Sequence, residues 1–134
     1  MWLCHCASFI LRSFFWLCDV HARDSGILEG ETDAAAVTAM KSWGLNIVRV
    51  PLNEDCWLGI NGVPSKFAGE NYQKGIKTYV DTLLDQDMVV IMDLHWTAPG
   101  DTLATKQMPM PDIDHSVTFW SQVAQQYNYS QNVV

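Results

Sequence analysis

Basic residues are scarce in this sequence, and the few that are present do not cluster. Eight Lys and Arg stand against 15 Asp and Glu, which gives a formal net charge of −7. An acidic protein repels phosphate backbones, and scattered cations cannot follow a nucleic-acid strand. We therefore expect no nucleic-acid partner and favour a neutral ligand.

Cysteine is almost absent beyond the amino terminus. Three of the four cysteines are Cys4, Cys6 and Cys18, and the fourth is Cys56. Zinc sites usually place about two to four residues between paired cysteines and add a second pair of ligands. The Cys4-His5-Cys6 spacing does not meet this pattern, so the sequence predicts no metal site.

The sequence also lacks a long apolar run that is free of charge. Residues 2–18 are rich in large apolar side chains, but His5 and Arg12 interrupt them. A transmembrane helix needs about 20 apolar residues, and a signal peptide carries its positive charge ahead of its apolar stretch. We therefore interpret residues 1–25 as an atypical apolar, cysteine-rich leader with no stable membrane insertion. Because Val20-His21-Ala22 has the small residues of a cleavage site, a degraded secretory signal is the alternative.

Helix patterns recur through residues 26–134. Helices are predicted over residues 34–43 and 70–86. A last helix is predicted from its single apolar face, made by Phe119, Trp120, Val123, Ala124 and Tyr127. Thr32 or Asp33 can cap the first helix, and Asp114 or Ser116 can cap the last one. Trp43 and Trp120 fall on the apolar stripes of these helices, so we expect both side chains in the core.

Strand patterns stand between these helices. Strands are predicted over residues 47–50 and 88–94, and a third strand begins at 132–134. Pro51 lacks an amide donor and is expected to end the first strand. The second run is continuously apolar, which is typical of a strand covered on both faces. Glycines and prolines predict long loops over residues 52–69 and 95–114.

Regular alternation of helices and strands favours an α/β fold with parallel strands and right-handed crossovers. A complete (β/α)8 barrel needs roughly 200 residues at the least and about 250 typically. The 134 residues of this chain therefore fit only a partial barrel, over residues 26–134.

Polar and aromatic residues gather where the two predicted strands end. Arg49, Asn53, Glu54, Asp55 and Trp57 follow the first strand, and Asp93, His95 and Trp96 end the second. Ligands of parallel α/β proteins bind beyond the carboxyl ends of the strands, so we expect a binding site there. Adjacent acids such as Glu54 and Asp55 rarely present two carboxyl groups across one bond. We interpret this pair as loop-ordering.

Three separated motifs carry a family resemblance: NIVRVPLNEDCWLGING (46–62), DLHWTAPG (93–100) and QMPMPDIDHSVTFW (107–120). In this order and spacing they resemble glycoside hydrolase family 5, the cellulase-like barrel hydrolases, and GILEGETDAA (26–35) resembles the stretch before the family's first helix. The resemblance implies a partial (β/α)8 TIM barrel, secretion, no cofactor, and a retaining endo-type β-glycosidase that hydrolyses a polysaccharide or oligosaccharide.

The resemblance also implies roles for particular residues. Arg49 matches the arginine that hydrogen-bonds close to the nucleophilic glutamate, and His95 matches a histidine that lines the sugar subsite. Trp57 and Trp96 would offer aromatic faces to sugar rings, with Asn53 as a further substrate-binding residue. Because the family is usually secreted, Cys56 is expected to form a disulfide with an upstream cysteine.

The catalytic glutamates of the family follow the fourth strand and later strands, so the resemblance places both after Val134. We therefore expect this chain to be inactive alone. The alternatives are a carbohydrate-binding pseudoenzyme without catalysis and an interaction module built on the apolar amino terminus. Asn128-Tyr129-Ser130 is a glycosylation acceptor consistent with secretion.

Overall fold

Two parallel strands form the centre of the structure. The computed structural model describes residues 27, 28 and 30–134, so the predictions made for the leader lie outside the described residues. Strand β1 (Ile47–Asn53) pairs in parallel with β2 (Val89–Trp96). Val133 forms a parallel bridge to Val90, which confirms that a third strand begins there. The predicted parallel pairing of the two main strands is confirmed.

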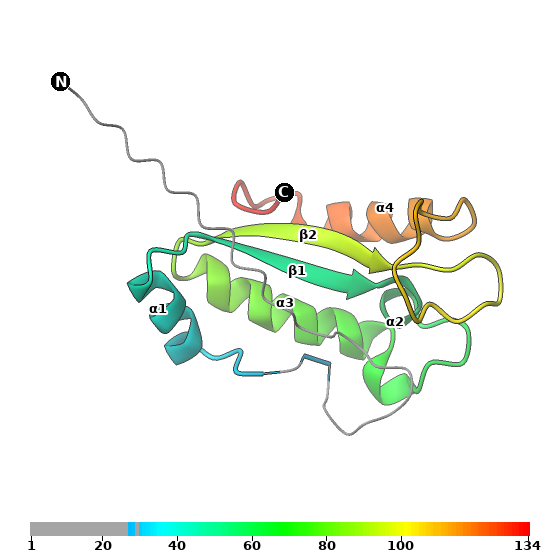
Figure 1. Ribbon diagram of the computed structural model, residues 1–134, viewed down its shortest axis with the longest axis horizontal. Coiled ribbons are helices and arrows are strands. Elements are labelled where there is room, and N and C mark those ends of the chain that lie inside the picture. Colours follow the sequence, from blue (N-terminus) through cyan, green and yellow to red (C-terminus); the bar gives the residue numbers. More distant parts are fainter. Residues whose placement is uncertain (1–26, 29) are drawn as a thin grey trace.

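Three helices pack against this pair of strands (Figure 1). They are α1 (Ala34–Ser42), α3 (Glu70–Leu84) and α4 (Ser116–Tyr127). Asp33 caps α1 by accepting from the amide of Ala36 at 2.8 Å, as predicted. Asp87 takes a left-handed conformation (φ 57°) between α3 and β2, where a non-glycine residue is uncommon and Asp is tolerated.

The start of α4 differs from the prediction. His115 is the N-cap residue and makes no side-chain cap bond. Neither predicted cap, Asp114 or Ser116, serves the helix, because both side chains have other partners: Asp114 accepts from the amide of Gly100, and Ser116 donates to Glu54.

The core lies on one face of the strand pair. Alternate strand residues are buried there in one apolar cluster with residues of all three helices, and the main contributors are Val48, Val50, Leu52, Val90, Met92, Val37, Met40, Ile76, Val80, Leu83, Phe119 and Val123. The opposite face holds Val89 and Ile91, which are only partly buried. The prediction that the second strand is covered on both faces is therefore wrong for the described residues.

Two tryptophans predicted in the core are exposed. Val37 and Met40 are the buried residues of α1, whereas Trp43 follows the last helical turn and is 69% exposed. Trp120 stands beside the buried stripe of α4 and packs its edge on Phe119, with 39% of its surface exposed. Both lie off the stripes that face the strands.

The loop predicted over residues 52–69 contains two short helices, α2 (Glu54–Leu58) and η1 (Ser65–Phe67). Asn53 caps α2 by accepting from the amides of Asp55 and Cys56 at 2.9 and 3.3 Å. Gly59 ends the helix in the left-handed region (φ 70°). An Asn N-cap and a Gly C-cap are ordinary helix start and stop signals. The helix was not predicted because the glycines and prolines of residues 52–69 favoured a loop.

Pro51 lies inside β1 and does not end it, contrary to the prediction. The carbonyl of Asn46 accepts from the amide of Val89 at 2.8 Å, so position 46 faces β2. Backbone groups alternate in direction along a strand, and position 51 therefore faces away from β2. The missing amide of Pro51 breaks no hydrogen bond with that neighbour.

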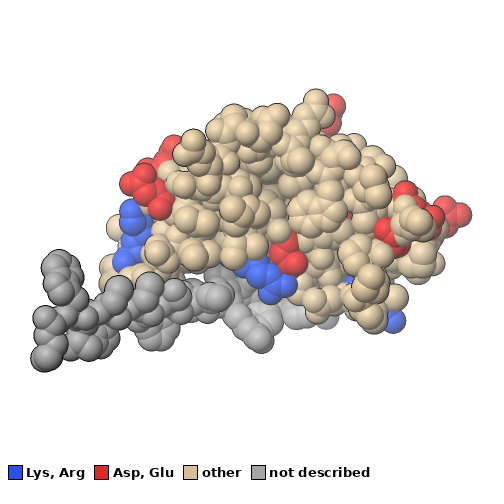
Figure 2. Space-filling view, turned by 90° about the horizontal axis from the view of Figure 1, so that it is seen from above, with Lys and Arg blue, Asp and Glu red and all other residues tan. Residues whose placement is uncertain are grey.

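Charged side chains on the face shown in Figure 2 stand mainly toward its edges, and the Lys and Arg side chains do not form a continuous band. Within the described residues, none of the helices has both the length and the apolar character that a membrane span requires.

Candidate functional site

The arrowheads of β1 and β2 point to the same end of the molecule, where α2 and the loop after β2 also lie (Figure 1). We call this end the rim, and residues 97–115 the rim segment. Two groups of polar residues lie at the rim. One is partly open to solvent on the strands themselves, and the other is buried beneath the rim segment.

The open group consists of Arg49, Asp93 and His95. Arg49 Nη2 lies 2.5 Å from Asp93 Oδ2 and 3.0 Å from His95 Nδ1, and His95 Nδ1 lies 2.9 Å from Asp93 Oδ2. The three side chains are 41%, 22% and 31% exposed, respectively. The predicted meeting of Arg49 and His95 at the same rim is confirmed.

The ring nitrogen Nδ1 of His95 can serve only one of its two neighbours. If Nδ1 carries the proton, it donates to Asp93, and Nε2 is left as an acceptor. If Nδ1 is bare, it accepts from Arg49, which only donates, and Nε2 carries the proton. In either tautomer the group offers hydrogen-bonding atoms of both kinds, which suits the hydroxyl groups of a neutral ligand.

Asp93 belongs to this group; from the sequence it was expected at the end of the second strand, without a role of its own. It bridges Arg49 and His95 through a single oxygen. A signal for it was present in the sequence, because residues 93 and 95 share one face of a strand. Asp93 holds both predicted residues in place.

Asn53 does not reach the open group. It is 1% exposed, its side-chain oxygen caps α2, and its Nδ2 donates to the carbonyl of Ala104 at 2.8 Å. Its own amide donates to the hydroxyl of Tyr72. The prediction that Asn53 binds substrate is therefore corrected: this side chain fixes the rim segment.

Trp57 is also buried, with no exposed surface. Its ring packs edge-on against Tyr72 and Phe119, with centroids 6.4 and 5.6 Å away, and its Nε1 donates to Gln122. No sugar ring can stack on it in this structure, which corrects the prediction for Trp57. Trp96 ends β2 at the rim and is partly exposed, so its predicted sugar contact stays a prediction.

The buried group contains Glu54 and Asp55, neither of which has exposed surface. Asp55 accepts from the amide of Ala104 at 2.7 Å and from Asn61 Nδ2 at 3.0 Å. Asn53 and Asp55 thus hold both backbone groups of Ala104, which agrees with the loop-ordering role predicted for the acidic pair. Burial raises the pKa of Asp55, and the bonds from Ala104 and Asn61 lower it.

Among the described residues, Glu54 has no cationic hydrogen-bond partner. Its Oε1 accepts from Ser116 Oγ at 2.9 Å, and its Oε2 is buried without a hydrogen-bond partner. Burial, followed by the neighbouring Asp112, raises the pKa of Glu54 to about 8. A carboxyl group with this pKa is largely protonated at neutral pH.

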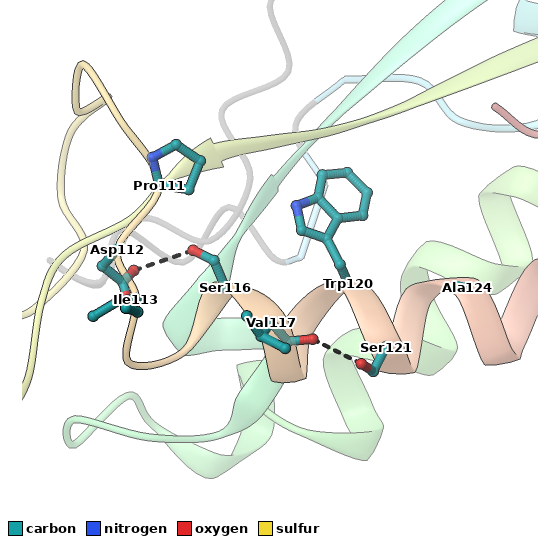
Figure 3. A pocket seen from close by; sticks show the side chains of 8 residues that line it. All are labelled: Pro111, Asp112, Ile113, Ser116, Val117, Trp120, Ser121 and Ala124. Atoms are coloured by element: carbon teal, nitrogen blue, oxygen red, sulfur yellow. Dashed lines mark hydrogen bonds between the residues drawn. The ribbon is translucent and has the colours of Figure 1, made fainter.

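A pocket opens beside these residues on the outer side of α4. Its volume is about 690 Å³, and Asp112, Ser116, Val117 and Trp120 are among the residues that line it. Figure 3 shows Asp112 bonded to Ser116 at the pocket wall, with the Trp120 indole farther along the helix. One side of the buried group therefore borders on a region that solvent can enter.

Within the described residues, no three His, Cys, Asp or Glu side chains are arranged to hold a metal ion. Cys56 is disulfide-bonded, as the sequence-based expectation held, and its partner lies outside the described residues.

Comparison with known proteins shows what the chain is similar to. A family model described as Cellulase (glycosyl hydrolase family 5) matches residues 17–134. The crystal structure of the clostridial cellulose synthase subunit Z from Clostridioides difficile is similar in fold, with a TM-score of 0.55 and 20% identity. The match covers 86% of this chain and 36% of that protein, so the chain spans about a third of its length. The search of curated proteins finds no match.

Proposed function

The chain belongs to glycosyl hydrolase family 5, and from this premise we propose that it forms the sugar-binding side of a retaining endo-type β-glycosidase. Its parallel strands and alternating helices are part of a (β/α)8 barrel, as predicted. The observation that supports the proposal is the open group at the rim, since barrel enzymes bind substrate beyond the carboxyl ends of their strands.

The chemistry of the open group suits a polysaccharide. Arg49 donates, Asp93 accepts, and His95 can do either, so together they can bind the hydroxyl groups of a sugar. Trp96, at the end of the same strand, would add an apolar face for the ring. The family name and the name of the similar structure both point to cellulose, so β-1,4-glucan is the first glycan to test.

The reaction itself needs two carboxyl groups. In a retaining glycosidase they stand roughly 5–5.5 Å apart across the bond, where one protonates the leaving oxygen and the other attacks the sugar carbon. Glu54 and Asp55 are buried and engaged with the rim segment, so neither suits these tasks. This observation also favours the alternative, a carbohydrate-binding protein without catalysis.

A combined binding and hydrolysis experiment tests the proposal. Soluble β-1,4-gluco- and β-1,4-manno-oligosaccharides are titrated into the chain by calorimetry, with an α-1,4-glucan as control. We expect binding of a β-linked glycan and no release of reducing sugar. His95→Ala should weaken binding about tenfold, which is the worth of one hydrogen bond to a ligand. Asp81→Asn, on the outer face of α3, serves as the matched control.

The outcomes separate the two parts of the proposal. Failure to bind any β-linked glycan would overturn the sugar-binding role, and unchanged affinity in His95→Ala would overturn the assignment of the open group. Steady release of reducing sugar by the 134-residue chain would contradict its expected inactivity.

A further inference from the structure

In the buried group, the hydroxyl of Ser116 lies between two carboxyl groups, those of Glu54 and Asp112. Ser116 Oγ lies 2.9 Å from Glu54 Oε1 and 3.3 Å from Asp112 Oδ2. A hydroxyl group has one proton, so Ser116 makes a full hydrogen bond to only one of them. Ionised carboxylates only accept, and Glu54 Oε2 is left buried without a donor.

One added proton resolves this arrangement. If Glu54 Oε2 carries a proton, it becomes a donor toward the neighbouring Asp112 carboxylate. Asp112 is held in place by the amide of His115, which donates to its Oδ1 at 2.7 Å. We propose that Glu54, Ser116 and Asp112 form a proton-dependent latch, in which one proton between the two carboxyl groups fastens the rim segment and the start of α4 to α2.

The elements that meet at the latch are far apart in sequence. Glu54 is the first residue of α2, Ser116 begins α4, and Asp112 lies in the rim segment between β2 and α4. When the latch opens, Glu54 gives its proton to water, and the pocket at Asp112 and Ser116 lets water reach the separated groups (Figure 3). The latch is independent of the sugar-binding proposal, because it concerns how the rim segment is attached.

Other titratable groups face this region and must be separated from the latch. Asp112 and His115 come from the rim segment, and Asp55 stands next to Glu54 on α2. The pKa of His115 is raised, first by its bond to the Gly100 carbonyl, and that of Asp55 is raised by burial. Titration of His115 and of Asp55 therefore weakens the attachment as pH rises, in the same direction as titration of Glu54.

The direction of the pH effect follows from the pKa of Glu54. It is about 8 with the latch closed and near its ordinary 4.5 once the group is exposed. The contribution of Glu54 is fully present below 4.5, declines as pH rises and is gone above about 8. The pKa of Asp112 is lowered below its ordinary 3.8, so its contribution has the opposite direction and is lost only in stronger acid. Between these limits one proton is released on opening, so the opening constant rises by up to about tenfold per pH unit and then levels off.

Hydrogen exchange measures this attachment directly. Protection factors, corrected for intrinsic exchange, are followed for the amides of His115 and Phe119, which donate to Asp112 and to the His115 carbonyl. In the wild-type chain they should fall between pH 5.5 and 8. In Glu54→Gln the side-chain amide accepts from Ser116 and donates to Asp112 without titrating. The fall in the protection factors should therefore be smaller than in the wild-type chain, by up to about tenfold per pH unit.

Controls and a second variant keep the test decisive. Asp81→Asn, in the exposed Lys77 pair on α3, should behave as the wild-type chain does. The bond from Ser116 lowers the pKa of Glu54. In Ser116→Ala the pH at which the opening constant stops rising should therefore move above about 8. Carboxyl-carbon NMR measures the midpoint of the Glu54 titration in the wild-type chain and in Ser116→Ala. This measurement does not depend on whether Glu54→Gln folds. A wild-type midpoint near 4.5, or an equal fall in Glu54→Gln, would overturn the latch.

Discussion

The two polar groups at the rim use similar residues in opposite surroundings. In the open group the Asp93 carboxylate meets the guanidinium of Arg49 while a fifth of its side chain remains exposed. In the buried group Glu54 and Asp55 have no exposed surface, and their bonds come from a hydroxyl, an amide and a backbone group. Asp93 is paired with a cation and remains in contact with solvent, whereas Glu54 and Asp55 are held by neutral donors away from solvent.

This difference separates ligand binding from structural support. A partly solvated ion pair keeps atoms available for a ligand and contributes little to folding. Buried acids with neutral donors present no exposed atoms to a ligand, and their loss leaves donors unpaired inside the protein. Nearness to the carboxyl ends of the strands, which both groups share, does not distinguish them, whereas burial does.

The largest expected effect comes from Trp57, the buried aromatic residue that follows Glu54 and Asp55 in α2. Trp57→Ala removes a ring that packs on Tyr72 and Phe119, so the free energy of unfolding should fall by about 3–5 kcal/mol. Trp43→Ala removes the same side chain from an exposed position and should change it by less than about 0.5 kcal/mol. Urea unfolding followed by circular dichroism measures both. Similar losses in the two variants would break the distinction drawn from burial.

The acids themselves sharpen the comparison. Asp55→Ala leaves the buried Ala104 amide without an acceptor and removes one of the acceptors of Asn61 Nδ2, so it should cost about 2–4 kcal/mol in unfolding free energy. Asp93→Ala breaks a partly exposed pair with Arg49 and should cost no more than about 1 kcal/mol. Glycan titration should show the reverse order, because only Asp93 belongs to the open group. A larger stability loss in Asp93→Ala would contradict this division.

The parts of the fold that follow from local patterns were predictable. The apolar periodicity of residues 70–86 and the apolar run at 88–94 predicted the long helix and the second strand, with ends that differ from the structure by two residues or fewer. Arg49 and His95 could be placed together because parallel strands bring their carboxyl ends to one edge. These inferences depend on neighbours in sequence or on one topological rule.

The parts that failed depend on contacts between distant segments. Nothing near Asn53 or Trp57 shows that the rim segment folds over the first and α4 packs on the second, because their partners Ala104 and Gln122 are about 50 and 65 positions away. Trp43 was misplaced because helical spacing was extended past the end of the helix. Asp93 was expected at the rim but was given no role, because it acts by holding two other residues, which the motif alone does not show.

The smallest expected effect belongs to an ion pair on α3 that is part of neither rim group. Lys77 Nζ is 2.6 Å from Asp81 Oδ2, one turn along α3, and each side chain is 44% exposed. Such pairs contribute about 0.3–0.5 kcal/mol, and less when the cation precedes the acid along the helix. Lys77→Ala should therefore lower the unfolding free energy by no more than about 0.5 kcal/mol. A double-mutant cycle with Asp81→Ala isolates the coupling, which should shrink further in about 1 M salt because surface charges are screened. If this coupling approached the cost of Asp55→Ala, a short charged contact alone would explain stability, and the contrast between the two rim groups would lose its physical basis.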